Sequence, residues 1–423
     1  MQLKPVLGPV QLVFYSVGVI IGAGVYSVIG AVAGHAGDDL WISFLVGAVI
    51  ALLTGLSYAE MTTSFPTAGA EYVYVRRAFP RVPWASFGVG WIILFGGAAT
   101  ATTVAVAFGG YLRIFADVPI MASAFMLLAA CTLVAIWGLR ESSWLNIVFT
   151  TIEVSGLLLV IAAGFTKPQI AQPLLNPDIQ PGIMAAAAIL FFVYLGFEEV
   201  ANLAEEVHEP GRDMPPAILW SIAITTVLYI LVSLAAVALV PPPELAASGA
   251  PLALAVERVW PGAGGLLSGI ALFATANTVL ITLIAISRLA FSMARDGEIP
   301  VVAARLAPER GTPWIASLIT FGLSVALLPI GDIAILAGLS SFAALLAFFA
   351  VNVALIALRY RHPDHKRPFR VPLNIGRLPV LPVLAIASIL VLLAYFDWKI
   401  YVAGAVAVAL TGVAYLARNV LRR

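Results

Sequence analysis

Long runs of apolar residues, separated by short polar or turn-forming stretches, repeat along the whole chain. A run of about 20 apolar residues is long enough to cross the hydrocarbon core of a bilayer as an α-helix. The pattern predicts an all-α polytopic membrane protein with twelve transmembrane helices. We expect these helices near residues 12–34, 40–62, 84–112, 118–138, 143–165, 180–202, 214–240, 263–293, 313–330, 332–358, 378–396 and 399–417.

Composition agrees with a membrane protein and excludes several other classes. Of the 423 residues, 61% are apolar and 11% are charged, a balance outside the range of soluble domains. The single cysteine, Cys131, excludes an internal disulfide framework, and four scattered histidines do not suggest a zinc enzyme. A formal charge of +1 leaves no basic surplus for nucleic acid. We therefore expect no nucleic-acid partner, no metal and no cofactor, with membrane lipid as the surrounding medium.

The positions of the basic residues predict the orientation. If the first span starts in the cytoplasm, all Lys and Arg except four lie on or toward the cytoplasmic side, the bias that orients helical membrane proteins. The four exceptions are Arg113, Lys167, Arg258 and Lys399. Both termini should be cytoplasmic, with the chain in the cell inner membrane and the first apolar run kept as a span.

Two spans carry interruptions at corresponding places. Residues 18–26 contain three glycines and an alanine, and residues 191–199 contain Gly196 followed by two carboxylates. Glycine weakens helical preference, and paired interruptions are typical of inverted-repeat transporters that bind substrate where both helices unwind. This predicts one transporter domain, 1–423, with a first repeat of five helices at about 12–165 and a second at about 180–358. Residues 378–417 would add two helices. The alternative is that the glycines mark close helix packing.

The two interruptions offer complementary chemistry. Free backbone N–H groups at Gly22, Ala23 and Gly24 would begin a half-helix, whose positive end favours a carboxylate. Carbonyl groups released in the other interruption would accept hydrogen bonds from an ammonium group; the candidates are those around Phe192, Val193 and Leu195. A zwitterion fits both. Phe192 and Tyr194 would shape or close the pocket, although aromatic rings at helical spacing also serve plain packing.

Isolated polar residues within the spans are the other candidates. Glu153 lies mid-span without a basic residue within one turn, which predicts proton coupling or cation binding. The alternative for Glu153 is a structural, hydrogen-bonded carboxyl group. Glu198 follows the second interruption and would close the pocket or contact a cationic group. Thr278 and Thr282 could line a cavity, but such hydroxyls also bond to their own helix backbone.

The chain resembles the amino acid-polyamine-organocation superfamily of secondary transporters over nearly its whole length. Five ordered motifs carry the resemblance: residues 18–26, 65–72, 196–198 continuing to 204–207 and 210, 288–289 with 293–297 and 300, and 367–372. The resemblance implies the inverted-repeat, leucine-transporter-like fold. It also implies a substrate carboxylate at Ile21, Gly22, Ala23 and Gly24, and a substrate amine at the carbonyls near Phe192, Val193 and Leu195.

The sequence departs from this superfamily at two positions. Ala70 stands where a second glycine is common, which affects loop geometry. Glu153 falls where related proton-coupled or sodium-independent members often have a lysine, so the charge is reversed. A glutamate attracts a cation or carries a proton itself, whereas a lysine replaces a bound cation, so the coupling mechanism cannot be transferred.

These observations predict a secondary active amino acid transporter that works by alternating access, as a proton symporter or an exchanger. The alternative is a carrier of cationic amino acids or polyamines, whose charge Glu153 and Glu198 would neutralise. An enzyme is not expected, because none of the histidines lies within a predicted span. The sequence leaves open the substrate side chain, the coupling ion and the oligomeric state.

Overall fold

The computed structural model describes residues 8–66, 70–138, 143–204, 207–308, 310–406 and 409. Positions 67–69 and 205–206 of the quoted motifs, and the end of the expected last span, lie outside this part of the chain. The described residues are mostly helical, and the strands among them are one short antiparallel pair, β1 (Asn374–Ile375) and β2 (Leu378–Pro379). The all-α fold class is therefore confirmed.

The first expected span consists of two helices, α1 (Pro9–Ile21) and α2 (Gly24–Ala36). The next helices are α3 (Leu40–Ser64), α4 (Ala70–Ala78), α5 (Pro83–Leu112), α6 (Ile120–Trp137) and α7 (Ser143–Gly164), followed by the short α8 (Gln172–Leu175). The sixth expected span contains α9 (Ile183–Leu190) and the 3-10 turns η3 (Phe191–Tyr194) and η4 (Glu199–Leu203).

The second half begins with the long helix α10 (Pro210–Leu239), and two short helices follow it, α11 (Pro242–Ala247) and α12 (Pro251–Glu257). The remaining elements are α13 (Ala263–Arg295), α14 (Trp314–Leu327) with the turn η6 (Leu328–Ile330), α15 (Ile333–Arg361) and α16 (Val380–Leu393). Further short turns are η1 (Gly37–Asp39), η2 (Pro168–Ala171) and η5 (Val301–Ala304).

Seven helices in the described residues are long and apolar enough to cross a membrane, or up to nine if two bent helix pairs each form one span. The protein is therefore a multi-pass membrane protein. Interruptions divide some of the expected spans into shorter helices. Helix α1 has 13 residues, and the helices Val380–Leu393 and Trp398–Val406 meet at an angle of 110°. The twelve-helix count remains a prediction.

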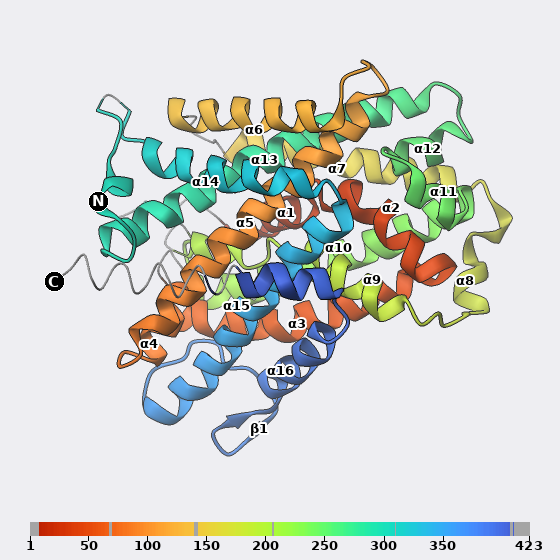
Figure 1. Ribbon diagram of the computed structural model, residues 1–423. Helices are drawn as coiled ribbons and strands as arrows, with labels where there is room; N and C mark the ends of the chain where they lie inside the picture. The colour runs from red at the N-terminus through yellow and green to blue at the C-terminus, as the bar shows by residue number, and fades with distance from the viewer. Residues whose placement is uncertain are drawn as a thin grey trace.

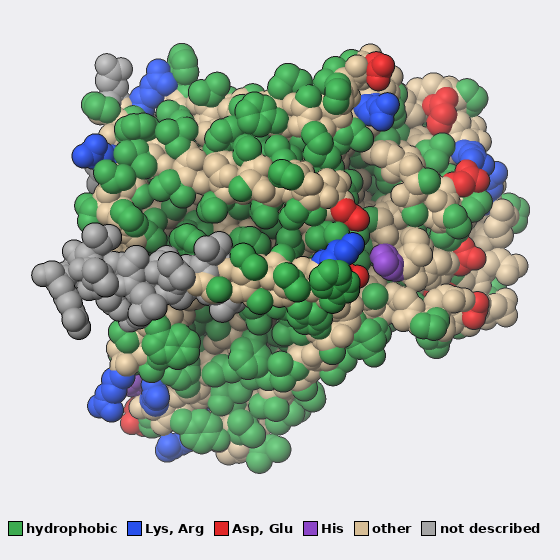
Figure 2. All heavy atoms as spheres, in the orientation of Figure 1, with side chains coloured by type: hydrophobic (Ala, Val, Ile, Leu, Met, Phe, Trp, Pro, Cys, Tyr) green, Lys and Arg blue, Asp and Glu red, His purple; other side chains and the backbone are tan. Residues whose placement is uncertain are grey.

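Long helices form the body of the bundle, and several short ones lie toward its ends. Helix α5 packs along α13 and α15, and α3 packs along α10. Helix α4 lies at one end of the bundle, and α11 and α12 lie at the other, against α2 (Figure 1). Apolar side chains cover most of the face in Figure 2, while Asp and Glu gather toward the end where α11 and α12 lie. This distribution suits a body surrounded by lipid.

Candidate functional site

The first interruption separates α1 from α2 by two residues. Gly22 has φ of +34°, in the region that favours glycine, and its N–H donates to the carbonyl oxygen of Gly18 at 3.0 Å, which ends α1. The carbonyl oxygen of Ala23 then accepts from the N–H of Ser27 at 3.0 Å, which starts α2. The interruption expected from the glycines is therefore present.

The hydrogen-bond donors at this interruption differ from those we expected. The N–H of Gly22 is used by Gly18, and the N–H of fully buried Ala23 donates to Thr278 Oγ1 at 2.9 Å. The prediction that both N–H groups are free is therefore wrong, because the end of α1 and a neighbouring hydroxyl satisfy them. In the described residues, no hydrogen bond uses the N–H groups of Gly24, Val25 and Tyr26. These three form the positive end of the 13-residue α2.

The second interruption lies directly against the first. After η3, Leu195 is extended and Gly196 has φ of +122°, so the helix of this span stops here. A Cβ atom added to Gly196 would lie 2.8 Å from the carbonyl oxygen of Val19. A Cβ atom added to Gly24 would lie 3.2 Å from the Cα of Val193. The glycines thus allow the two backbones to approach each other closely.

A tyrosine from a third helix bridges the two interruptions. The Tyr229 hydroxyl on α10 lies 2.9 Å from the carbonyl oxygen of Ile20 and 3.0 Å from that of Val193. With one proton, it donates to one of the two at a time. Sequence reasoning did not select Tyr229. A tyrosine in the middle of the apolar run 214–240 was the available signal, because a buried phenol needs a hydrogen-bond partner.

The aromatic residues of the second interruption are buried. Tyr194 is fully buried and donates its hydroxyl proton to the carbonyl oxygen of Phe44 at 2.8 Å. Its ring meets that of Tyr229 edge to face, with centroids 5.7 Å apart. Phe192 is 3% exposed. In this conformation both residues form part of the packing around the interruption.

Glu153 on α7 is close to the first interruption. Its side chain is 1% exposed, and Oε1 accepts from Asn277 Nδ2 at 3.3 Å. Its backbone carbonyl accepts from the Tyr26 hydroxyl at 2.6 Å, and Tyr26 belongs to the first turn of α2. In the described part of the chain, no ion pair involves Glu153. Asn277 is thus its side-chain partner, and Asn277 is the neighbour of Thr278, the acceptor for Ala23.

Thr278 and Thr282 differ in their contacts. Thr278 holds the first interruption through its hydroxyl group. Thr282 lies about one turn further along α13 and is half-buried, and the described residues include no hydrogen-bond partner for its side chain. Thr278 therefore belongs to the candidate site by direct contact, whereas Thr282 shares only its helix.

Glu198 stabilises the second interruption itself. It is half-buried, and its Oε2 accepts from the N–H of Gly196 at 2.9 Å. Near this segment, Glu71 on α4 accepts from the Tyr58 hydroxyl at 2.8 Å. Burial raises the pKa of Glu71 to about 7, and the nearby Glu199 carboxylate adds to the rise. Glu71 lies within the motif at 65–72, but its position in the sequence did not identify it as a site residue.

A cavity of about 530 Å³ lies on the α11 and α12 side of α2. Its walls come from α2, from the α11 and α12 segment, and from the start of α15. Ser27 is one of the lining residues, and its hydroxyl donates to the carbonyl oxygen of Ala23 at the first interruption. The cavity therefore reaches to within one helical turn of the candidate site.

Comparison with known proteins gives one family for nearly the whole chain. Residues 7–417 match the model of a family described as "Amino acid permease". Over 94% of its length, the chain is 30% identical to the branched-chain amino acid permease BcaP of Bacillus subtilis, 89% of which is covered. It is 30% identical to the methylthioribose transporter of the same organism, over 91% of this chain and 87% of that protein. It is 33% identical to the vacuolar cationic amino acid transporter 4 of Arabidopsis thaliana, over 86% of this chain and 64% of that protein.

Proposed function

The chain belongs to the amino acid permease family, and on that basis we propose that it is a secondary active transporter of a zwitterionic amino acid. The relatives are permeases and transporters, and the protein is accordingly not an enzyme. One observation carries the substrate class: unused N–H groups and interrupted-helix carbonyl groups meet where Gly24 contacts Val193. A carboxylate suits the first set of groups and an ammonium group suits the second.

The substrate carboxylate would bind the N–H groups at the start of α2, from Gly24 onward. Its ammonium group would bind carbonyl oxygens of the second interruption, around Val193 and Leu195. Since the Tyr229 hydroxyl already contacts the Val193 carbonyl, the ammonium group would share that oxygen or displace the hydroxyl. Thr278 would hold the backbone of the first interruption in place, and Glu198 would do so for the second.

We further propose that the protein has twelve transmembrane helices, with residues 12–165 and 180–358 as inverted repeats. Both termini would be cytoplasmic and the membrane would be the inner membrane. The placement of interruptions in the first helix of each proposed repeat, together with the distribution of Lys and Arg, supports this arrangement. In an inverted repeat, rocking of one set of helices against the other exposes the site to each side in turn.

Glu153 is the proposed proton-coupling group. It is buried without an ion-pair partner in the described residues, and one hydrogen bond joins its side chain to α13 next to Thr278. A negative charge at this depth costs free energy, and proton uptake by Glu153 would remove that charge. We expect Glu153→Gln to abolish the pH dependence of amino acid uptake into proteoliposomes while substrate binding survives. Unchanged pH dependence in that variant would exclude Glu153 from coupling.

A cationic substrate is the second candidate, because cationic amino acid transporters are among the relatives and Glu153 offers a negative charge. Competition binding to purified protein separates the two candidates. If alanine or leucine displaces a bound radiolabelled substrate and agmatine or putrescine does not, the zwitterion proposal stands. Displacement by the amines alone would refute it. A thermal-shift screen of amino acids would first identify the substrate to be radiolabelled, since a ligand that binds the folded state raises the apparent stability of the protein.

A further inference from the structure

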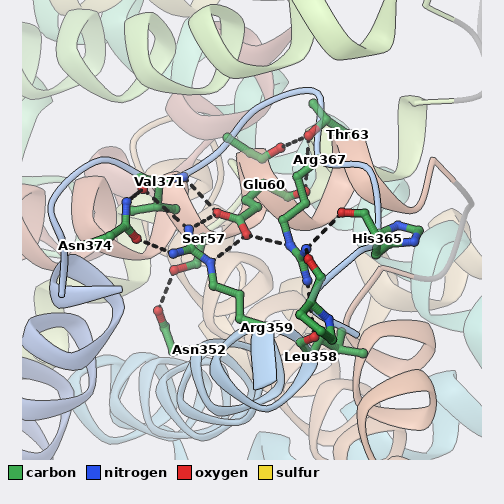
Figure 3. A network of polar contacts seen from close by, with 12 residues as sticks. Ser57, Glu60, Thr63, Asn352, Leu358, Arg359, His365, Arg367, Val371 and Asn374 are labelled. Atoms are coloured by element: carbon green, nitrogen blue, oxygen red, sulfur yellow. Dashed lines mark hydrogen bonds and ion pairs between the residues drawn. The ribbon is translucent and has the colours of Figure 1, made fainter. Parts of the chain in front are cut away.

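A buried ionic network joins the end of α3 to the end of α15 and to the loop that follows α15 (Figure 3). We call it the Glu60 clamp; its members are Glu60, Arg359, Arg367, Val371 and Asn374. Glu60 lies one turn before the end of α3, and Arg359 lies in the last turn of α15. The loop supplies the other three residues, one of which, Arg367, opens the motif at 367–372. The proposed transport mechanism uses none of them.

The clamp is closed to solvent and its carboxylate is fully bonded. The side chains of Glu60 and Arg359 are each 2% exposed. Glu60 Oε1 accepts from Arg359 Nε at 2.9 Å and lies 3.3 Å from Arg367 Nε. Glu60 Oε2 contacts Arg359 Nη2 and accepts from the N–H of Val371 at 2.7 Å. Three hydrogen-bond donors and one further guanidinium group, all from one helix and its following loop, therefore hold a single carboxylate of another helix.

The loop after α15 is folded back onto the end of that helix. Arg367 donates to the carbonyl oxygens of Leu358 at 3.1 Å and His362 at 3.0 Å, which also accept from the N–H groups of His362 and His365 at the end of the helix. Asn374 accepts from Arg359 and donates to the carbonyl oxygen of Val371 at 2.9 Å. These bonds fix the loop, so that α15 and its loop approach α3 as one piece.

The contact between α3 and α15 continues beyond the clamp. The Ser57 hydroxyl donates to Asn352 Oδ1 at 2.7 Å, and Asn352 is fully buried. The rings of Tyr58 and Phe348 meet edge to face, with centroids 5.5 Å apart. The two helices are therefore joined by an ion pair, a buried hydrogen bond and an aromatic contact.

The clamp matters because each of its helices packs mainly elsewhere. Helix α3 lies along α10, while α15 lies along α5. Any motion between these two pairs of helices would pull the clamp apart. Separating a buried ion pair without replacement partners lowers the population of the separated state on the order of a hundredfold to a thousandfold. The clamp would thus resist such motion at this end of the bundle.

We propose that Glu60 is a positioning residue of the transport cycle, which keeps the adjoining ends of α3 and α15 together in every conformation. The passage on the side of the membrane where the clamp lies then opens away from the contact between α3 and α15. This inference rests on the proposed alternating-access function. It predicts that α3 and α15 can be linked covalently without stopping transport.

The test uses a cross-link between Ser57→Cys and Asn352→Cys, the pair in direct contact. Cys131 is the one cysteine in the sequence, so Cys131→Ala provides a cysteine-free background. The cross-link is closed in proteoliposomes with an oxidant or mercuric ion, and free thiol is quantified. We expect uptake within about twofold of the reduced protein. Loss of uptake on closure, restored by reductant, would overturn the proposal, as would a pair that neither reagent closes.

A matched control links α2 to α11, whose residues line the cavity beside the candidate site, so that opening of this cavity would separate them. A Cβ atom added to Gly34 lies 3.1 Å from the Cβ of Ala246, so Gly34→Cys with Ala246→Cys places two thiols in contact. Closing this link should stop uptake reversibly, which shows that the assay detects a blocked motion. Protein that carries no amino acid even when reduced would refute the proposed function, a result distinct from failure of the clamp.

A second variant tests Glu60 directly. Glu60→Gln removes the charge that faces both guanidinium groups, and we expect the folded, reconstituted variant to show uptake reduced several-fold in Vmax with KM unchanged. Closing the cross-link between positions 57 and 352 in this variant should restore uptake. A cross-linked Glu60→Gln protein that remains as slow as the reduced form would contradict a positioning role.

Discussion

Thr278→Val tests the hydrogen bond that holds the first interruption. Valine matches threonine in shape but lacks the hydroxyl that accepts from the Ala23 N–H at 2.9 Å. Ala23 is fully buried, so its N–H would lose its partner in a place where an unsatisfied group costs about 1 to 3 kcal/mol. Thr278 itself is half-buried, and partial access of water favours the lower part of that range. We expect a loss of about 1 to 2 kcal/mol, or roughly a 5- to 30-fold change in the unfolding equilibrium.

The measurement is equilibrium unfolding in mixed detergent micelles, followed by tryptophan fluorescence. Thr278→Ser keeps the hydroxyl and should retain most of the stability. Thr282→Val changes the same residue type one turn away, where the described residues offer no hydrogen-bond partner, and it should be nearly neutral. A Thr278→Val protein as stable as the wild type would refute the reasoning. Equal losses at positions 278 and 282 would also refute it.

Two further predictions concern Tyr229 and Glu71. Tyr229→Phe removes a hydroxyl that reaches the carbonyl groups of both interruptions, so the ligand-free protein should lose about 1 kcal/mol in the same unfolding assay. A neutral result would contradict the bridge. For Glu71, burial raises the folded-state pKa to about 7, so the folded protein binds the proton more tightly than the unfolded chain does. Stability should therefore fall as pH rises from about 4.5 to about 7. In Glu71→Gln this component should be absent, and an identical pH profile in both proteins would exclude Glu71 as its source.

The interruptions were predictable because glycine weakens a helix wherever it occurs in a chain. The apolar runs predicted the all-α fold in the same way, since a run of about 20 apolar residues can satisfy its backbone within its own segment in lipid only as a helix. Gly22 and Gly196 were expected at helix breaks, and both adopt positive φ there. Which N–H groups remain unused was not predictable, because the partner of Ala23 is 255 residues away at Thr278.

The sequence by itself determined the class of protein, the helical fold, the positions of the two breaks and the isolation of Glu153 from nearby charges. These are local properties, because they depend on residues within one or two helical turns. Only the tertiary structure brought Tyr229 to the carbonyl groups of two separate helices, Asn277 to Glu153, and Arg359 to Glu60 across 299 positions. Such pairs depend on how whole helices pack, and a buried polar group accepts whichever partner that packing places within about 3 Å.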